Sequence, residues 1–186
     1  MNREIELKEI FQDTCASDKL AHNYAPVYAN VSKNIGRMLE LGVAHGFSLL
    51  AWLQAFPMAE IYGVDITLDL APSALNLTSN PRVKLIQADV RSFEPQNSLP
   101  NFDLVVDDCS HQIKDILRMW DKLYLKTKSV YIIEDLDFER MIPIWQHITK
   151  AVPKHQMILW RTSDCDGRYQ HIEGDSHCLI VKMENR

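Results

Sequence analysis

The sequence predicts an α/β fold, a doubly wound and mainly parallel sheet of seven strands that ends in an antiparallel C-terminal hairpin. Three observations lead to this prediction. Apolar strand-like segments alternate with helical segments, which is the pattern of βαβ units. The strands are continuous apolar runs such as "VYII" rather than alternating ones, as expected where helices cover both faces of a parallel sheet. The last two strand-like segments have no helix between them, which favours a hairpin at one edge.

The first third of the chain begins with helices and then enters the sheet. Helices are expected at 2–12 and 25–34, before the first strand. That strand, "RMLELGV" at 37–43, is a short apolar run that leads into a glycine turn. The next helix, "SLLAWLQAF" at 48–56, is apolar and ends before Pro57, because proline cannot continue a helix.

The rest of the chain continues the alternation. Apolar runs that end in an acidic residue predict strands, and the segments between them predict helices, of which the longest is amphipathic. The expected strands are 60–66, 83–89, 102–108 and 129–135, the expected helices are 69–77, 112–125 and 139–152, and the final strands are 156–163 and 177–183. Seven strands with a terminal hairpin are the layout of the Rossmann-like class I methyltransferases.

Length and composition indicate one globular domain, 1–186, with 1–35 as an N-terminal helical cap segment. A hydrophobic fraction of 46% is sufficient for a substantial core, and no repeat or linker-like stretch divides the chain. The net charge of −5 argues against a broad nucleic-acid surface and favours a small-molecule partner. We find no signal peptide and no apolar segment long enough to span a membrane, so a cytoplasmic protein with reduced thiols and no membrane partner is expected.

The cysteines offer one alternative function, a zinc site. Its candidate ligands are Cys165, His171, His177 and Cys178. Their spacing fits no common zinc pattern, and Cys178 lies in a predicted strand. Core-facing cysteines and ordinary histidines are therefore the favoured interpretation.

The loop after the first strand, "LELGVAHGFSL", is a candidate ligand-binding turn. It places Glu40, Gly42 and Gly46 in the spacing Glu-x-Gly-x-x-x-Gly. Glycines allow a positive φ and a close approach of a ligand to the backbone. The G-x-G-x-x-G of dinucleotide sites is missing, which argues against an NAD dehydrogenase. The spacing resembles the first motif of S-adenosylmethionine (SAM) methyltransferases.

Two acidic residues at the ends of the next strands extend this candidate site. Asp65 ends the second strand, where a carboxylate can accept hydrogen bonds from both ribose hydroxyls. Asp89 ends the third strand and is placed to lie near an adenine edge. Either residue alone could be a turn or cap residue. Together with Glu40, at the side of the sheet where open α/β folds bind ligands, they predict an adenosyl ligand.

Acidic residues also gather at the ends of the fourth and fifth strands. The stretch "VVDDCSH" brings Asp108, and "YIIED" brings Glu134 and Asp135. Adjacent strands lie about 4.8 Å apart, so these carboxylates should meet and repel one another. A divalent cation relieves that repulsion, and an all-oxygen set suits Mg²⁺. His111, three residues after Asp108, is a candidate general base beside the metal, because histidine readily accepts a proton near neutral pH.

At this point several ordered motifs resemble one family, the metal-dependent O-methyltransferases that act on macrolide sugars, which includes the cephalosporin hydroxylase group. "DDCSH" and "YIIEDL" resemble its DDGSH and IEDL signatures, and "SDKLAHNYAPVY" at 17–28 resembles its N-terminal segment. "LELGVAHGFSLLAWLQAFPMAEIYGVDI" at 39–66 resembles its glycine-containing block. The resemblance covers 17–136, with a weaker echo at 174–182.

The resemblance implies roles residue by residue. Mg²⁺ would be held by Asp108, Glu134 and Asp135, with His111 as the catalytic base. SAM would be bound by the loop from Glu40 through Gly42 to Gly46, by Asp65 and Asp89, and by Asp107. Asp18, Lys19, His22 and Tyr24 would close over the cofactor or substrate. Cys109 departs from the family's glycine at a position where an unusual φ is expected.

The sequence therefore predicts a Mg²⁺-dependent SAM O-methyltransferase that acts on a small-molecule diol, sugar or natural product. Related enzymes form oligomers, so a homo-oligomer is expected. Two alternatives stay open: a SAM-binding protein of the same fold with different chemistry, and a non-catalytic SAM-binding subunit of a partner. The polar loop 164–176 is a candidate contributor to the substrate site.

Overall fold

The computed structural model describes residues 2–14, 18–95, 99–161 and 177–183. Three helices precede the sheet: α1 (Arg3–Asp13), α2 (Asp18–Ala21) and α3 (Ala25–Ala29). The strands are β1 (Arg37–Leu41), β2 (Glu60–Asp65), β3 (Val83–Gln87), β4 (Phe102–Asp107), β5 (Thr127–Leu136), β6 (Met157–Arg161) and β7 (His177–Lys182). Between them lie α4 (Phe47–Ala55), α5 (Ile113–Leu123), α6 (Phe138–Ile148) and the 3-10 helices Pro72–Ser79, Tyr124–Lys126 and Lys154–Gln156.

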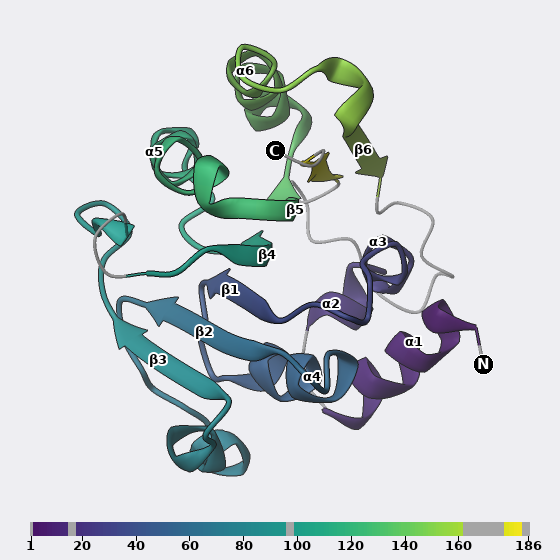
Figure 1. Ribbon diagram of the computed structural model, residues 1–186, viewed down its shortest axis with the longest axis vertical. Coiled ribbons are helices and arrows are strands. Elements are labelled where there is room, and N and C mark those ends of the chain that lie inside the picture. Colours follow the sequence, from purple (N-terminus) through teal and green to yellow (C-terminus); the bar gives the residue numbers. More distant parts are fainter. Residues whose placement is uncertain (1, 15–17, 96–98, 162–176, 184–186) are drawn as a thin grey trace.

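The seven strands form one sheet in the order β3-β2-β1-β4-β5-β7-β6 (Figure 1). Strands β1 to β5 pair in parallel, and β7 is inserted antiparallel between β5 and β6. The predicted doubly wound, mainly parallel sheet with an antiparallel C-terminal hairpin is thus confirmed. The order reverses between β1 and β4, and ligands of open α/β sheets bind at such a switch point.

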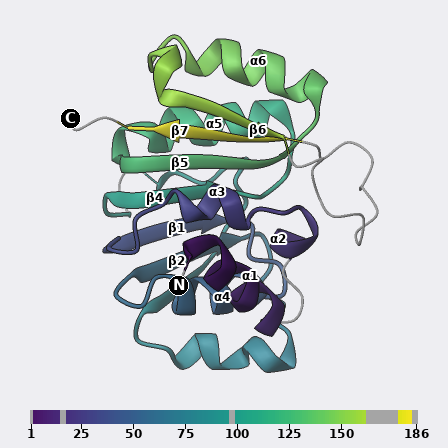
Figure 2. The same cartoon turned by 90° about the vertical axis from the view of Figure 1, so that its right-hand side faces the viewer.

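Two helical layers cover the sheet, one on each face. Helices α1, α3 and α4 pack on one face, in front of the strands in Figure 2, and α5 and α6 pack on the other. Successive side chains of a strand point to opposite faces. In β1, Met38 belongs to the layer of α1 to α4, whereas Leu39 belongs to the layer of α5 and α6. This alternation decides which acidic side chains can reach the edge of the sheet.

Some predicted helices are shorter or of another kind in the structure. The helix predicted at 25–34 ends at Ala29, because the Asn30 side chain turns back and donates to the Pro26 carbonyl at 2.8 Å. The helix predicted at 69–77 is the 3-10 helix that starts at Pro72, whose fixed φ suits a first helical turn. Helix α2 was not predicted at all.

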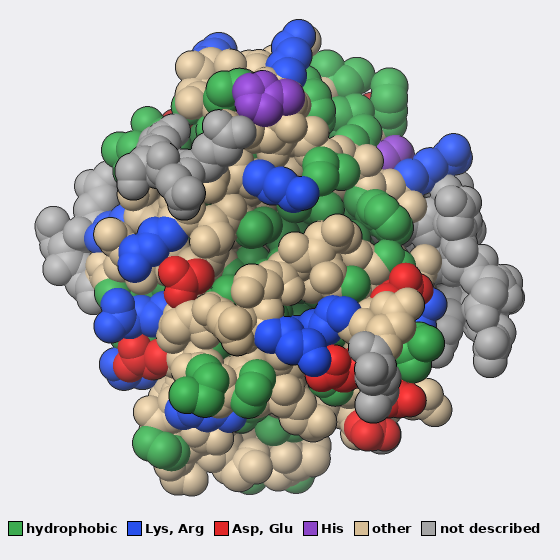
Figure 3. Space-filling view, turned by 45° about the vertical axis from the view of Figure 1, so that its right-hand side comes forward, with side chains coloured by type: hydrophobic (Ala, Val, Ile, Leu, Met, Phe, Trp, Pro, Cys, Tyr) green, Lys and Arg blue, Asp and Glu red, His purple; other side chains and the backbone are tan. Residues whose placement is uncertain are grey.

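The described surface bears on possible partners. On the part of the face in Figure 3 that the structure describes, basic and acidic side chains are interspersed and form no field of one sign. No helix in the described ranges has the length and apolar character needed to cross a bilayer. The loop 164–176, and with it Cys165 and His171, falls outside the described residues, while Cys178 is fully buried in the core.

Candidate cofactor and metal site

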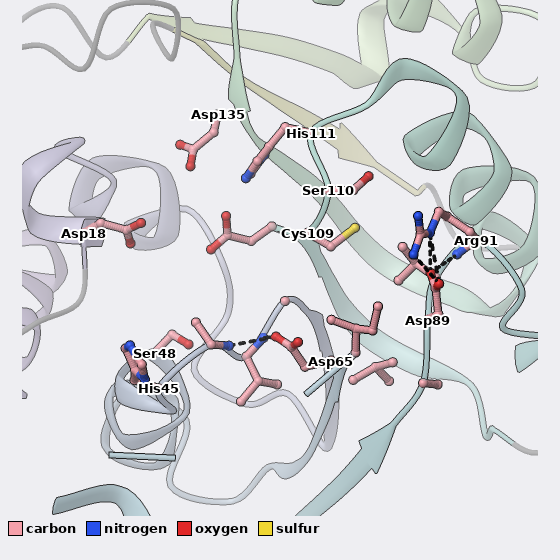
Figure 4. A pocket seen from close by; sticks show the side chains of 18 of the residues that line it. Asp18, His45, Ser48, Asp65, Asp89, Arg91, Cys109, Ser110, His111 and Asp135 are labelled. Atoms are coloured by element: carbon pink, nitrogen blue, oxygen red, sulfur yellow. Dashed lines mark hydrogen bonds and ion pairs between the residues drawn. The ribbon is translucent and has the colours of Figure 1, made fainter. Parts of the chain in front are cut away.

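A cavity of about 690 Å³ opens at the carboxyl ends of the central strands. Half of the predicted site residues line it: Asp18, Gly42, Asp65, Asp89, Asp108, His111 and Asp135. The others do not line it: Lys19, His22, Tyr24, Glu40, Gly46, Asp107 and Glu134. In Figure 4, Asp18, His111 and Asp135 point toward a common space, and Asp65 and Asp89 lie further along the same cavity. The cavity therefore has an acidic end and a second end formed by β2 and β3.

Gly42 makes the turn that lets β1 and β4 end side by side. Its φ is +91°, and its N–H donates to the Val64 carbonyl at 2.9 Å. A Cβ on this residue would lie 2.0 Å from the carbonyl oxygen of Asp108. Gly46, with a φ of +85°, precedes α4, and a Cβ there would meet the side chains of Leu70 and Leu77. Both predicted glycines thus fix the path of the loop.

Asp65 ties this loop to the end of β2. Its Oδ2 accepts hydrogen bonds from the N–H groups of Val43 at 2.7 Å and Ala44 at 2.8 Å, and its Oδ1 accepts from Thr67 N–H at 3.0 Å. Ala44 has a φ of +45°, a conformation that costs an alanine about 1–2 kcal/mol. The carboxylate of Asp65 therefore holds a strained loop at the cavity wall.

The end formed by β2 and β3 combines an apolar wall with an ion pair. Ile66, half exposed, lines the cavity together with Ala88 and Val90, and sequence reasoning had not singled out these three residues. Asp89 makes a two-pronged ion pair with the Arg91 guanidinium, at 2.6–2.9 Å. These hydrogen bonds lower the pKa of Asp89 to about 2, so its carboxylate is charged.

At the acidic end, Asp108, His111 and Asp135 come together. One ligand atom from each lies within 4.8 Å of the others, close enough to hold a metal ion. His111 and Asp135 both have a positive φ, +51° and +53°. Such strained backbone is concentrated at functional sites. At Asp135 it breaks the strand alternation and turns the carboxylate into the cavity.

Two side chains from the N-terminal segment hold Asp135 in this position. The Tyr24 hydroxyl donates to Asp135 Oδ1 at 2.6 Å and accepts from Asp135 N–H at 3.0 Å. His22 stacks on the Tyr24 ring and places its Nδ1 3.6 Å from the same Oδ1. Tyr24 was predicted to close over the cofactor or substrate; in the structure it contacts Asp135 and does not line the cavity.

Lys19 lies behind the acidic end, fully buried. Its ammonium donates to Asp108 Oδ2 at 2.5 Å and to Glu134 Oε2, and it lies 3.8 Å from Glu40 Oε1. Burial alone lowers the pKa of an ammonium, but these carboxylates outweigh it, so the pKa of Lys19 lies well above its usual range. Lys19 is therefore a permanent positive charge between the ends of β4 and β5.

Glu134 faces Lys19 rather than the cavity. Its Oε1 accepts from the Tyr28 hydroxyl at 2.5 Å, and its Oε2 accepts from Lys19. Burial, and next the charges of Asp108 and Asp135, raise the pKa of Glu134 well above its usual range despite Lys19. The structure thus brings Asp108 and Asp135 of the predicted metal ligands to the cavity and leaves Glu134 behind them.

Glu40 lies in the layer between the sheet and α4. Its carboxylate accepts from Ser48 Oγ at 2.7 Å and from Trp52 Nε1 at 3.0 Å. Burial raises the pKa of Glu40 to about 7, although Lys19 and these donors favour the charged form. Side-chain alternation in β1 explains the position, because Glu40 points to the same face as Met38.

Replacing Glu40 by glutamine should change how stability depends on pH. A folded-state pKa above the ordinary 4.5 means that folding favours the protonated acid. That contribution is present below about pH 4.5 and is lost as the pH rises through about 7. Glutamine does not titrate, so the unfolding free energy of Glu40→Gln should rise relative to that of wild type by about 3 kcal/mol between pH 4.5 and pH 7. Urea denaturation at several pH values measures this change. The exposed Glu139→Gln is the control, and a pH-independent difference between Glu40→Gln and wild type would contradict the prediction.

Asp107 and Cys109 flank Asp108, and of the two only Cys109 lines the cavity. Asp107 accepts from Cys109 Sγ at 3.0 Å and from the Tyr131 hydroxyl at 3.3 Å, and burial raises its pKa to about 6. Asp107 therefore supports the turn rather than lining the cavity. The left-handed non-glycine residues in the described ranges are Asn23, Ala44, His111 and Asp135. Cys109 is not among them, so this turn accommodates a cysteine without backbone strain.

Comparisons with known proteins agree with this arrangement. A family model described as FtsJ-like methyltransferase matches residues 19–137, well over half of the chain. The match begins at Lys19 and ends just after Leu136, and so covers both ends of the cavity. No curated protein matches the sequence.

Several solved structures share the fold. One is MycE, a methyltransferase from the mycinamycin biosynthetic pathway in complex with Mg, S-adenosylhomocysteine (SAH) and mycinamycin VI, with a TM-score of 0.64 and 20% identity. The match covers 98% of this chain and 56% of MycE, so the chain spans about half of that protein. The plantazolicin methyltransferase BpumL in complex with SAH has a TM-score of 0.58 at 13% identity, covering 97% and 96% of the two chains. A putative O-methyltransferase from Klebsiella pneumoniae has 0.60 at 15%, covering 98% and 90%.

Proposed function

The chain belongs to the FtsJ-like methyltransferase family, and from this premise we propose that it transfers a methyl group from SAM to a hydroxyl of a small molecule, with Mg²⁺ at the acidic end of the cavity. The observation that carries the proposal is the single cavity of about 690 Å³, which Gly42, Asp65 and Asp89 share with Asp108, His111 and Asp135. A methyl donor and a chelated acceptor could therefore meet in one space.

The cavity's residues suit the two parts of SAM. The apolar wall of Ile66, Ala88 and Val90 suits an adenine ring, and Asp65 lies where a carboxylate can bind ribose hydroxyls. The turn at Gly42 keeps the backbone close to the cavity without a side chain. MycE and BpumL, which share the fold, were both solved with SAH, and this supports the same class of ligand here.

The donor set at the acidic end fits a hard divalent cation. Asp108 and Asp135 offer carboxylate oxygens at the cavity, and Mg²⁺ is commonly held by one or two carboxylates with its other positions left to water or substrate oxygens. Lys19 supplies one positive charge beside Glu40, Asp108 and Glu134, and of these three acids only Asp108 lines the cavity. When bound, Mg²⁺ would lower the pKa of a substrate hydroxyl that it contacts.

His111 is the residue proposed to take the proton from the reacting hydroxyl. Its ring lines the cavity, and its backbone is fixed by Arg140, whose guanidinium donates to the His111 carbonyl at 3.1 Å and to Asp137 at 2.9 Å. Positioning of donor, acceptor and base in one cavity would supply most of the rate acceleration.

A natural product or sugar diol is the proposed acceptor, in line with the mycinamycin VI bound to MycE.

Isothermal titration with SAH tests the cofactor half of the proposal. Wild type should bind SAH, and Asp65→Ala should bind it at least about 100-fold more weakly, because the ribose contact and the anchor of the loop at Val43 and Ala44 are both removed. Asp121→Ala, on the exposed side of α5, is the matched control and should bind SAH as wild type does. Absence of SAH binding to wild type would contradict the proposed transfer of a methyl group from SAM.

Transfer of a labelled methyl group to simple diols tests the chemistry. Catechol and methyl glycosides, incubated with labelled SAM, should become methylated with Mg²⁺ and not with EDTA. SAH binding without Mn²⁺ binding would instead favour a SAM-binding subunit of a partner.

A homo-oligomer is also proposed, and sedimentation velocity would test it.

A further inference from the structure

The buried ammonium of Lys19 occupies the position that a metal bridging Asp108 and Glu134 would take. Its Nζ contacts one oxygen of each carboxylate, and these come from the ends of the neighbouring strands β4 and β5. Asp108 and Glu134 are two of the three ligands predicted from the sequence. A cation that belongs to the chain itself therefore already joins them.

The second oxygen of Glu134 is engaged as well. Tyr28, fully buried in α3, donates its hydroxyl to Oε1 at 2.5 Å. Glu134 is 1% exposed and does not line the cavity, whereas Asp108 and Asp135 do. For Glu134 to ligate a metal, it would have to give up both partners and leave Lys19 buried beside a divalent ion, where like charges repel.

We propose that Lys19 is a tethered cation that keeps Glu134 out of the metal site and leaves Mg²⁺ to Asp108 and Asp135. The inference rests on the proposed function and deepens it, because it assigns the ligand set and makes Lys19 a positioning residue. Lys19 also orients Asp108, since it binds Oδ2 of a carboxylate that lines the cavity. Removing the Lys19 charge should open the space between Asp108 and Glu134 to a metal ion.

Titration with Mn²⁺, followed by the loss of the free-ion signal in electron paramagnetic resonance, tests the ligand set without any acceptor. With Lys19 present, the single substitutions Asp108→Asn and Asp135→Asn should each weaken Mn²⁺ binding at least about 100-fold. Glu134→Gln should change the Mn²⁺ affinity by less than about threefold. Loss of Mn²⁺ binding in Glu134→Gln to the extent seen in Asp108→Asn would overturn the inference, because Glu134 would then be a ligand.

The Lys19→Met variant tests the role of the charge. We expect it to bind Mn²⁺ at least about tenfold more tightly than wild type, and Glu134→Gln in that background should abolish the gain. Lys33→Met, which removes an equal charge from an exposed pair with Glu6, is the matched control and should bind as wild type does. If Lys19→Met does not fold, the comparison of wild type with Glu134→Gln decides alone.

The outcomes separate this inference from the proposed function. Equal Mn²⁺ affinity of folded Lys19→Met and wild type would overturn the role of Lys19 while the metal-dependent reaction stands. Binding by Lys19→Met but not by wild type would overturn the ligand set of Asp108 and Asp135 and would also contradict the Mg²⁺-dependent reaction. Absence of Mn²⁺ binding from both proteins would overturn the inference, and SAH titration would still test the cofactor half.

Discussion

A Gly42→Ala variant is expected to lose about 3 kcal/mol of unfolding free energy and to lose SAH binding. The φ of +91° costs an alanine about 1–2 kcal/mol, and overpacking costs about 1–3 kcal/mol more. The overlap cannot be relieved by a side-chain rotation, because the new Cβ would lie 2.0 Å from a backbone oxygen, that of Asp108. The strand ends must separate, and this moves Asp108 as well as the loop.

Urea denaturation and SAH titration of the same preparation measure both effects. Gly36→Ala is the matched control, since its Cβ would meet only the Asp103 carboxylate at 3.3 Å and its φ is not in the left-handed region. We expect that control to remain within about 1 kcal/mol of wild type. Wild-type stability and SAH affinity in Gly42→Ala would contradict the close approach of β1 and β4 described above.

A His111→Asn variant is expected to lose about 10²–10⁴-fold in kcat, the usual contribution of a general base. Asparagine tolerates a positive φ better than most residues, so the +51° turn at this position should survive the substitution. SAH and Mn²⁺ should bind as in wild type, because Asp65, Asp108 and Asp135 are unchanged. The rate is measured with the diol that the methyl-transfer screen identifies.

His147→Asn is the matched control, because this histidine pairs with Asp121 on the outside of α5 and α6. It should leave kcat unchanged. A kcat for His111→Asn within about threefold of wild type would exclude His111 as the base. Loss of Mn²⁺ binding instead would make His111 a metal ligand, which its position beside Asp108 and Asp135 also permits.

Strand ends were the part of the site that sequence predicted best. An apolar run that stops at an acidic residue marks the carboxyl end of a strand to within about two residues, and Asp65, Asp89 and Asp108 all line the cavity. The same pattern predicted the seven strands and the terminal hairpin. These features follow from local composition and from the alternation of strand-like and helical segments.

Side-chain alternation along the strands explains why some of the acidic residues do not reach the cavity. Glu40 is two residues from Met38, and Glu134 is two residues from Ile132, so both share the face of α1 to α4. Asp107 is two residues from Val105 and faces α5. Asp135 would also face α5, and only its left-handed backbone turns it to the cavity. That strain depends on tertiary contacts such as the one with Tyr24, which no local pattern encodes.

Lys19 was predicted to close over the cofactor, yet it lies under the carboxylates. A lysine is rarely buried unless it is paired, and its partners here are far away in the sequence. Helix α2, which carries it, has four residues and no periodicity to detect. Its position is a consequence of three acidic side chains, Glu40, Asp108 and Glu134, that meet only when β1, β4 and β5 are placed together.

The contacts that complete the acidic end join residues 106 to 115 positions apart, from the N-terminal segment to the end of β5. During synthesis, Lys19, Tyr24 and Tyr28 emerge long before their carboxylate partners exist. Contacts of such long range form late in folding, because the entropy of closing a large loop must be overcome first. A nascent chain can therefore fold β1 to β3 early, but it gains a working acidic centre only when β5 arrives and α2 and α3 dock against it.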